Sequence, residues 1–447
     1  MPELLGLARR VLEQAGDGEE VEVYAARHRE TSIRVFEGAV EELTAAESAG
    51  VGVRVISAGR QGFSYVGTLD ESAAAEALSE ARDNSGFATV DENAGLASPD
   101  GVEPPQLQLW RQELVSFPTD DKVALALELE RRVRVGDSRI RQVVSSDYVD
   151  ALGETAIATS RGIEVAGRKT GCYLFVHAIA GDGDDTQTGF GYSVGRAPGD
   201  LDPGVAASDA VERATRLLGA KKPRSARLIA VLDRRVTAAL LGILSRTLSG
   251  EEVVKGRSLF AGRVGEQVGV DELTLVDDPT NPLAYGASPH DAEGLACRCN
   301  SLITGGELKG FLYDTYAGRI AGTASTGSAV RGGFRTTPGV GARALSLEPG
   351  KLDQFRIIAQ VGEGLLVQSI TGVHSGVNPV SGDFSVGAEG LMIRGGELAE
   401  PVRELTIAST IQRMLQHVVA IGSDVEWLPG AASGVTLAID DIAMSGT

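Results

Sequence analysis

The chain has 447 residues, and 43% of them are hydrophobic, which is enough apolar content for two or three domains with cores of their own. Its formal net charge of −19 argues against nucleic-acid binding, because no cluster of Lys or Arg is large enough to reverse it locally. Three unevenly spaced cysteines, no apolar run of about 18 residues and no signal-like N-terminus predict a cytoplasmic protein without a membrane span.

The first quarter of the sequence predicts a helix followed by short strands. Leu4, Leu7 and Val11 repeat at helical spacing, and alternating apolar residues then predict strands at 21–25, 32–36, 40–46, 51–57 and 62–66. Thr68 and Glu71 form a capping-box pattern that predicts a second helix reaching residue 81.

The same order of elements is predicted again later in the chain. A helix at 120–135, strands near 139–148, 154–160, 170–179 and 188–194, and a helix at 203–218 repeat the first series. ESAGVGVRVISAGRQGFSYVG (47–67) also aligns with RKTGCYLFVHAIAGDGDDTQTGFGYSVG (168–195). An internal duplication is therefore predicted, with two unrelated α+β units as the alternative. The proline-containing stretch 87–118 predicts an extended connection that wraps the surface.

The pattern changes after Pro223. An apolar strand at 226–232 precedes a helix with a wide apolar stripe that includes Leu240, Leu241 and Leu244. From 262 to 447, short strands separated by glycine turns predict a mostly antiparallel sandwich or barrel around that helix. The predicted fold is α+β, with an N-terminal duplicated α/β half at 1–222 and a strand-rich half at 223–447.

Motifs in the second half point to a known family. The stretch TGVHSGVNPVSGDFSVGAEGLMIRGGELAEPV (371–402) resembles the closing motif of the TldD/PmbA family of bacterial peptidase subunits. The resemblance continues through GRSLFAGRVGEQVGVDELTLVDDPTNP (256–282) and SPHDAEGLACRCNSLITGGELKGFLYDTYAGRIAG (288–322). It implies a peptidase assembly that acts on small, unstructured peptides.

The family contains zinc-bearing and zinc-free subunits. In the zinc-bearing TldD type, an H-E-x-x-x-H motif precedes the segment that starts here at Gly256, and its positions fall on Leu241, Gly242 and Arg246. None of these residues can ligate zinc or act as a base, and GSDVEWLPGAASG (422–434) lacks the TldD-type cysteine. The chain therefore resembles the PmbA (TldE) type. No catalytic residue, metal or other cofactor is predicted for it, and zinc is expected on a TldD-type partner.

The closing motif supplies candidate residues for contact with a peptide substrate or a partner subunit. These are His374, Ser375, Asn378, Asp383, Phe384 and Ser385. A serine hydrolase using His374 and Ser375 is a weaker alternative, because neighbouring strand residues point to opposite faces and no G-x-S-x-G elbow is present. Asp383 also has a simpler interpretation, as a turn residue that accepts hydrogen bonds from nearby backbone amides.

Three other features have no assigned chemistry. The Cys297-Arg298-Cys299 spacing fits neither a zinc site nor a redox pair and predicts buried or half-buried thiols. The glycine-rich segments GVGVRVISAGRQG and GGFRTTPGVGARA lack phosphate-loop spacing. The segment His290-Asp291-Ala292-Glu293-Gly294 matches the family, but its role does not follow from sequence. A stand-alone peptide-binding scaffold is a further alternative, as is a homodimer for the chain in isolation.

Overall fold

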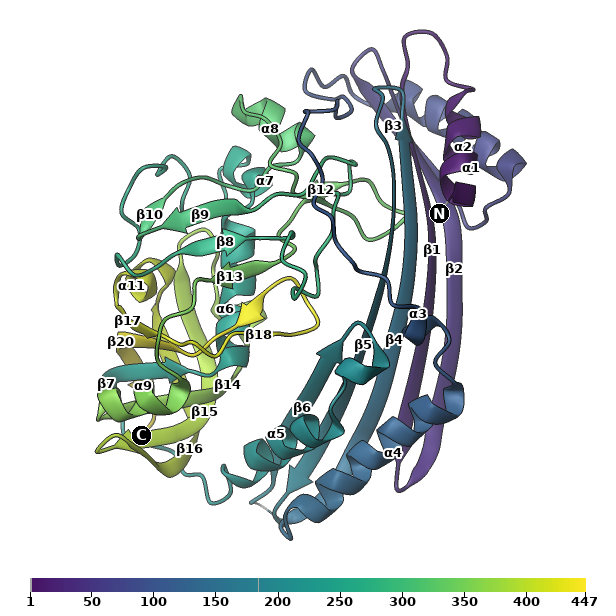
Figure 1. Cartoon of the computed structure of the whole chain (residues 1–447). Coiled ribbons are helices and arrows are strands. Elements are labelled where there is room, and N and C mark those ends of the chain that lie inside the picture. Colours follow the sequence, from purple (N-terminus) through teal and green to yellow (C-terminus); the bar gives the residue numbers. More distant parts are fainter. Residues whose placement is uncertain (1, 184) are drawn as a thin grey trace.

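The structure is a computed structural model that describes residues 2–183 and 185–447. The first half forms one antiparallel six-stranded sheet in the order β3-β2-β1-β4-β5-β6, which lies beside the second half (Figure 1). Its strands are β1 (Glu20–Phe36), β2 (Ala39–Ser57), β3 (Arg60–Val66), β4 (Ile140–Thr159), β5 (Glu164–Ala180) and β6 (Gln187–Gly195). Its helices are α1 (Pro2–Leu12), α2 (Glu71–Phe87), α3 (Gln112–Val115), α4 (Thr119–Gly136), α5 (Pro203–Thr215) and the short 3₁₀ helix η1 (Pro198–Asp200).

The duplication predicted from the sequence is confirmed. Each copy is helix, three strands, helix, and the two copies join into one sheet where β1 pairs with β4. The predicted breaks within strands were wrong, because β1, β2 and β4 are continuous over 17, 19 and 20 residues. The capping residue was also wrong, since the Asp70 carboxylate, and not Thr68, accepts a hydrogen bond from the Ala73 amide at the start of α2.

The helices cover one face of the sheet. Val21 and Val23 pack against α1 and α2, and Ile33 and Val35 pack against α4 and α5. Because side chains alternate along a strand, residues such as Tyr24 point to the other face. That face looks towards the second half of the chain (Figure 1).

The second half contains a closed barrel. Its strands follow the order β16-β15-β14-β7-β20, and a pairing between β16 and β20 closes it. Only the β7–β14 pair is parallel among the pairings described for this barrel. A sixth strand extends from β20. The strands are β7 (Ala226–Leu232), β14 (Gly364–Thr371), β15 (Asp383–Arg394), β16 (Glu397–Thr410), β17 (Val418–Ile421) and β20 (Leu437–Ser445).

A helix packs between this barrel and a smaller sheet, whereas the sequence predicted strands arranged around the helix. It is α6 (Arg234–Thr247), which starts at Asp233 and buries Leu240, Leu241 and Leu244. The smaller sheet contains β10 (Glu307–Leu308), β9 (Asn300–Thr304), β8 (Leu275–Asp277) and β13 (Leu345–Leu347). Two short ribbons are β11 (Ala329–Val330) with β12 (Gly339–Val340) and β18 (Glu426–Trp427) with β19 (Ser433–Gly434). The remaining helices are α7 (Gly250–Val254), α8 (Thr315–Ala321), α9 (Gln354–Val361), α10 (Val373–Gly376) and α11 (Ile411–Gln416).

The connection after α2 joins the two halves instead of wrapping the outer surface. Leu96 and Leu109 are buried, and Arg319 of α8 donates hydrogen bonds to the carbonyls of Asn93 and Leu96. The expectation of a surface position was therefore wrong, because the apolar residues of this segment reach the seam between the halves. In the part of the chain that the structure describes, no helix has the length and apolar character needed to cross a membrane.

Candidate functional site

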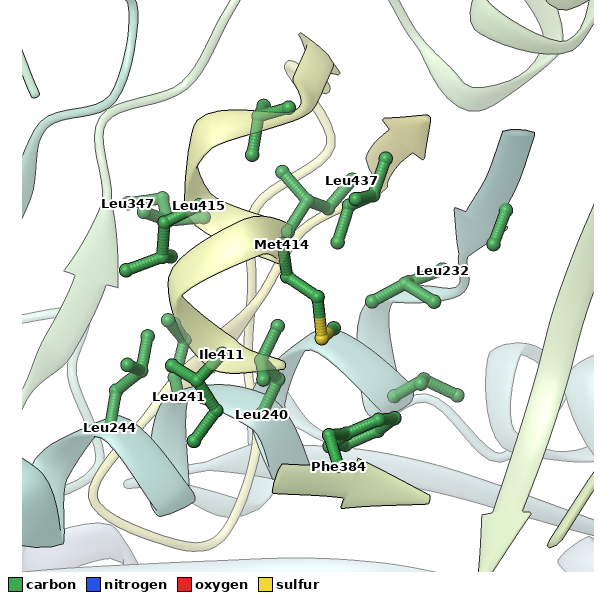
Figure 2. Packing of buried hydrophobic residues seen from close by; sticks show 14 of the residues in the cluster. Leu232, Leu240, Leu241, Leu244, Leu347, Phe384, Ile411, Met414, Leu415 and Leu437 are labelled. Carbon is green, nitrogen blue, oxygen red and sulfur yellow. The ribbon is translucent and has the colours of Figure 1, made fainter. Parts of the chain in front are cut away.

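The positions aligned with the zinc motif lie on α6 and do not suit a metal. Leu241 is 1% exposed and belongs to the core, where Figure 2 shows it beside Ile411 and Leu415. Gly242 and Arg246 are exposed. Leucine and glycine offer no ligand atom, and a guanidinium stays protonated, so this helix cannot hold zinc. Among residues 2–183 and 185–447, no group of three or more His, Cys, Asp or Glu is placed to hold a metal ion.

His374 and Ser375 lie on the short helix α10, not on a strand as predicted. Both are exposed, and the Ser375 hydroxyl donates to the Gly372 carbonyl at 3.3 Å. Helix α10 lies against β15, since a Cβ on Gly376 would be 2.0 Å from the Ser385 carbonyl oxygen. Within the described residues no hydrogen bond joins the His374 imidazole to Ser375 or Ser385, so the structure lacks a nucleophile–base pair here.

The turn before β15 depends on Asn378 more than on Asp383. The Asn378 side-chain oxygen accepts hydrogen bonds from the Val380 and Ser381 amides at 2.9 and 3.2 Å. The Asp383 carboxylate accepts from the Ser381 hydroxyl at 2.7 Å, so its predicted bonding to backbone amides was wrong. Phe384 is buried in the barrel core, while Ser385 is exposed on β15. The predicted residues therefore share one surface region, except for Phe384, which supports it from inside.

A cavity that the sequence did not indicate lies between the two halves. It has a volume of about 570 Å³, and its walls come from the face of the sheet opposite the helices and from three loops of the second half. Residues of β1, β4 and β5 form one wall, while loops 288–292 and 331–335 together with Arg343 form the other. Pockets of this size commonly bind small ligands.

The segment of unknown role, residues 290–294, borders this cavity and anchors the halves to each other. The Asp291 carboxylate accepts hydrogen bonds from the amides of Glu293, Leu295 and Ala329. The Glu293 carboxylate accepts from the Thr315 amide at 2.9 Å, at the start of α8. Gly294 has a φ of +85°, and a Cβ there would be 2.5 Å from a methyl carbon of Ile163 on the first half. This close approach requires glycine.

Buried charges join the halves beside the same segment. Glu22 of β1 forms ion pairs of 2.8 Å with both Arg54 of β2 and Arg331 of the second half. Arg54 is also 3.8 Å from Glu293. These four side chains are almost completely buried, with exposed fractions of 2–6%. Separation of the two halves would leave buried charges without their partners, which is energetically costly. This group of charges therefore fixes the position of one half on the other.

The carboxylates of this region have shifted pKa values in opposite directions. Burial alone would raise the pKa of Glu22, but Arg331 and Arg54 outweigh burial and hold it below its ordinary value. Burial raises the pKa of Glu293 to about 7, because Arg54 offsets only part of the lost hydration. Burial also raises the pKa of Asp291 to about 6, despite its three backbone hydrogen bonds.

The glycine-rich segments that lack phosphate-loop spacing are part of the same seam. Phe334, from the GGFRTTPGVGARA segment, packs over β2, where a Cβ on Gly50 would be 2.5 Å from its ring. A Cβ on Gly52 would be 2.3 Å from the Phe334 carbonyl oxygen. Small residues on β2 thus allow the second half to approach the sheet closely.

Family models match almost the whole chain. They are described as PmbA/TldA metallopeptidase domain 1 over residues 21–85, the central domain over 113–218 and the C-terminal domain over 225–446. The chain belongs to the PmbA/TldD family. This membership confirms the resemblance of the motifs between 256 and 402.

Several relatives of this PmbA/TldD member carry peptidase names. The Escherichia coli O157:H7 protein called metalloprotease PmbA is 26% identical over 94% of this chain and 92% of its own length. A Haemophilus influenzae protein called a metalloprotease TldD homolog is 24% identical over 95% of this chain and 92% of its own length. A Methanothermobacter thermautotrophicus metalloprotease is 27% identical over 91% and 88%, so the family extends to archaea.

Solved structures of similar proteins share the fold. A Thermotoga maritima protein proposed as a modulator of a DNA gyrase has a TM-score of 0.90 and 25% identity, over 98% of this chain and 99% of that one. TldE from Thermococcus kodakarensis has a TM-score of 0.87 and 24% identity, over 99% and 100%. At this identity the second likeness shows the fold alone.

Proposed function

We propose that this chain is the non-zinc partner subunit of a TldD/TldE-type metallopeptidase that processes small, unstructured peptides in the cytoplasm. The observation that carries the proposal is that α6 has no zinc-ligating residue at the family's zinc-motif positions, although the chain belongs to a metallopeptidase family. The family's first zinc position holds a core leucine, and the other two hold Gly242 and Arg246. A chain without these ligands needs a TldD-type homologue for metal chemistry.

The proposed assembly is a heterodimer or a larger complex built from such heterodimers. His374, Ser375, Asn378, Asp383 and Ser385 are accessible around β15 and α10, which supports a role in contacting the peptide or the partner. The charge of −19 supports a peptide substrate over a nucleic acid. Without that partner, the isolated chain would form a homodimer in place of the heterodimer.

The test is reconstitution with a zinc-bearing homologue from the same genome. The purified chain alone should contain no stoichiometric zinc by elemental analysis and should not cleave an unfolded peptide. After mixing, we expect co-purification of the two chains and cleavage that a chelator abolishes. Stoichiometric zinc in the isolated chain, or cleavage by it alone, would contradict the proposal.

Two substitutions separate the alternatives. A Ser375→Ala, Ser385→Ala double variant should still support chelator-sensitive cleavage by the mixture, since no nucleophile–base pair exists at these residues. Loss of cleavage in that variant, with the complex intact, would favour the serine hydrolase. Peptide binding without any activity in the mixture would favour the stand-alone scaffold.

A further inference from the structure

We propose that the cavity between the two halves binds the carboxylate of a short peptide, with an apolar side chain of the same peptide held beside it. The inference deepens the proposed function, on which it rests for the identity of the ligand as a peptide. In this proposal, this chain recognises either the C-terminal carboxylate of the substrate or the carboxylate of one acidic side chain. The partner subunit is not needed for that step.

The first argument is charge. The protein as a whole has a net charge of −19, yet the cavity lining contains six Lys or Arg side chains and only two carboxylates. One of these carboxylates, Asp291, is already engaged by three backbone amides. A positive cavity in an acidic protein attracts anions specifically to that place.

The second argument is that several of these cations lack an acidic partner. Among the described residues, no ion pair or hydrogen bond engages the Lys169 side chain of β5. Arg343 interacts electrostatically with the buried Asp277 and Asp291 but forms no direct ion pair within the described residues, and its buried Nε has no hydrogen-bond partner there. The guanidinium groups of Arg168 and Arg335 lie over the rings of Trp110 and Phe334. An anion in the cavity would compensate these charges.

The pKa of Lys169 also reflects surroundings that are poor in negative charge. Its side chain is exposed at the cavity, although the protein atoms around it still reduce its hydration. That loss of hydration, together with the nearby Arg343 and Arg196, lowers the pKa of Lys169 to about 8. A bound carboxylate would favour the protonated form and strengthen the interaction at neutral pH.

The third argument is the apolar wall. Tyr24, Ala26, Ile157 and Phe334 form a small hydrophobic cluster that lines the cavity together with Val165. A ligand that fills about 570 Å³ therefore meets both cations and apolar surface, with Arg331 over the Tyr24 ring and Arg335 over the Phe334 ring. A peptide residue with a carboxylate and an apolar side chain matches both.

The walls would bind an anion through side chains and not through the start of a helix. All the lining residues belong to strands or loops, so no helix N-terminus contributes its amides to the cavity. The recognition must come from Lys and Arg side chains, and Arg pairs with a carboxylate through two parallel hydrogen bonds.

Binding to the purified chain tests the inference. The probes are three fluorescent hexapeptides of the same apolar core: one with a free C-terminus, one C-terminally amidated, and one amidated with an internal Glu. We expect micromolar binding by fluorescence polarisation for the first or the third, and at least tenfold weaker binding for the amidated neutral peptide. The first and third peptides distinguish a terminal carboxylate from an acidic side chain.

Variants locate the site. Lys169→Met and Arg335→Met should each weaken binding of the carboxylate peptide about tenfold, whereas Lys169→Arg should retain it. Lys351→Met is the matched control, because Lys351 is an exposed lysine outside the cavity. This variant should bind the carboxylate peptide as tightly as the unmodified chain. Thermal melting of each variant verifies that it is folded.

Three results would overturn the inference. They are equal binding of all three peptides, no effect of both Met variants, and displacement of the peptide by millimolar inorganic phosphate but not by acetate. None of them depends on the zinc-bearing homologue. A chain that binds no carboxylate peptide yet activates that homologue would disprove this inference and leave the proposed function standing.

Discussion

At the scale of single residues, Glu293 connects stability to pH. Its pKa of about 7 in the folded chain lies above the ordinary 4.5, so the folded state holds a proton that the unfolded state releases. Stability therefore falls as pH rises from about 5 to 7, by on the order of 3 kcal/mol, and then levels off. Arg54, Asp291 and Asp314 surround this carboxyl group and shape the transition.

The substitution Glu293→Gln should remove that dependence. Gln keeps an acceptor for the Thr315 amide but carries no titrating proton, so urea unfolding at pH 5, 6, 7 and 8 should show a flatter profile than the unmodified chain. Glu397→Gln, at an exposed position of β16, should keep the original profile. A constant difference between Glu293→Gln and the unmodified chain at every pH would contradict the assignment.

Sequence identified these residues but not their role. The motif containing Asp291 and Glu293 was visible, whereas Arg54, which lies near Glu293, and Glu22, which pairs with Arg54, are more than 200 residues earlier and belong to ordinary strand patterns. No local rule links positions so far apart. Asp383 was misjudged because Asn378, at the start of the turn, accepts the hydrogen bonds from the turn's amides.

At the scale of elements, the polar residues within long strands made these strands look shorter in the sequence than they are. Residues 39–48 of β2 are exposed, and they form an edge of the sheet because β3 pairs only with residues 51–57. Alternation of apolar and polar residues therefore weakens there, and the pattern was interpreted as interrupted strands. The order of elements, in contrast, was predictable, since it depends only on the buried segments.

The duplicated strands β2 and β5 contact the second half in equivalent ways. In the alignment of the two copies Gly50 corresponds to Gly171, and each faces an aromatic ring of the second half. A Cβ on Gly50 would be 2.5 Å from Phe334, and one on Gly171 would be 3.0 Å from the Tyr285 hydroxyl. The repeat thus provides two matching contact points for one partner domain.

Alanine at Gly50 should disturb this contact. The added Cβ would also lie 2.3 Å from the Val66 carbonyl oxygen, and overpacking of this kind costs about 1–3 kcal/mol. Gly67→Ala is the matched control, since its Cβ would have no neighbour within 4 Å. Equal unfolding free energies for the two variants would show that the second half does not need this close approach.

At the scale of the whole molecule, the barrel requires its last strand. β20 pairs with β7, β16 and β17, so it completes the sheet on one side of β7 and closes the ring. The sheet of the first half has no strand in common with this barrel. The two halves therefore differ in which segments of the chain they need in order to fold.

Removal of residues 437–447 should unfold the second half selectively. Without β20, one edge of β7 and one of β16 are unpaired, and the core around Leu437 and Ile439 is lost. Limited trypsin digestion should then degrade the region after residue 222 quickly and leave a fragment of the first half. Uniform resistance along the truncated chain would contradict this division.

The position of β20 in the sequence also has a consequence for biosynthesis. About 200 residues separate it from β7, and a ribosome adding about 5–20 residues per second needs roughly 10–40 s to make them. During that interval the apolar strand Ala226–Leu232 has emerged without this neighbour. Nascent chains on one messenger can meet through such unpaired edges, so slower initiation, which spaces the ribosomes, should raise the yield of correctly folded protein.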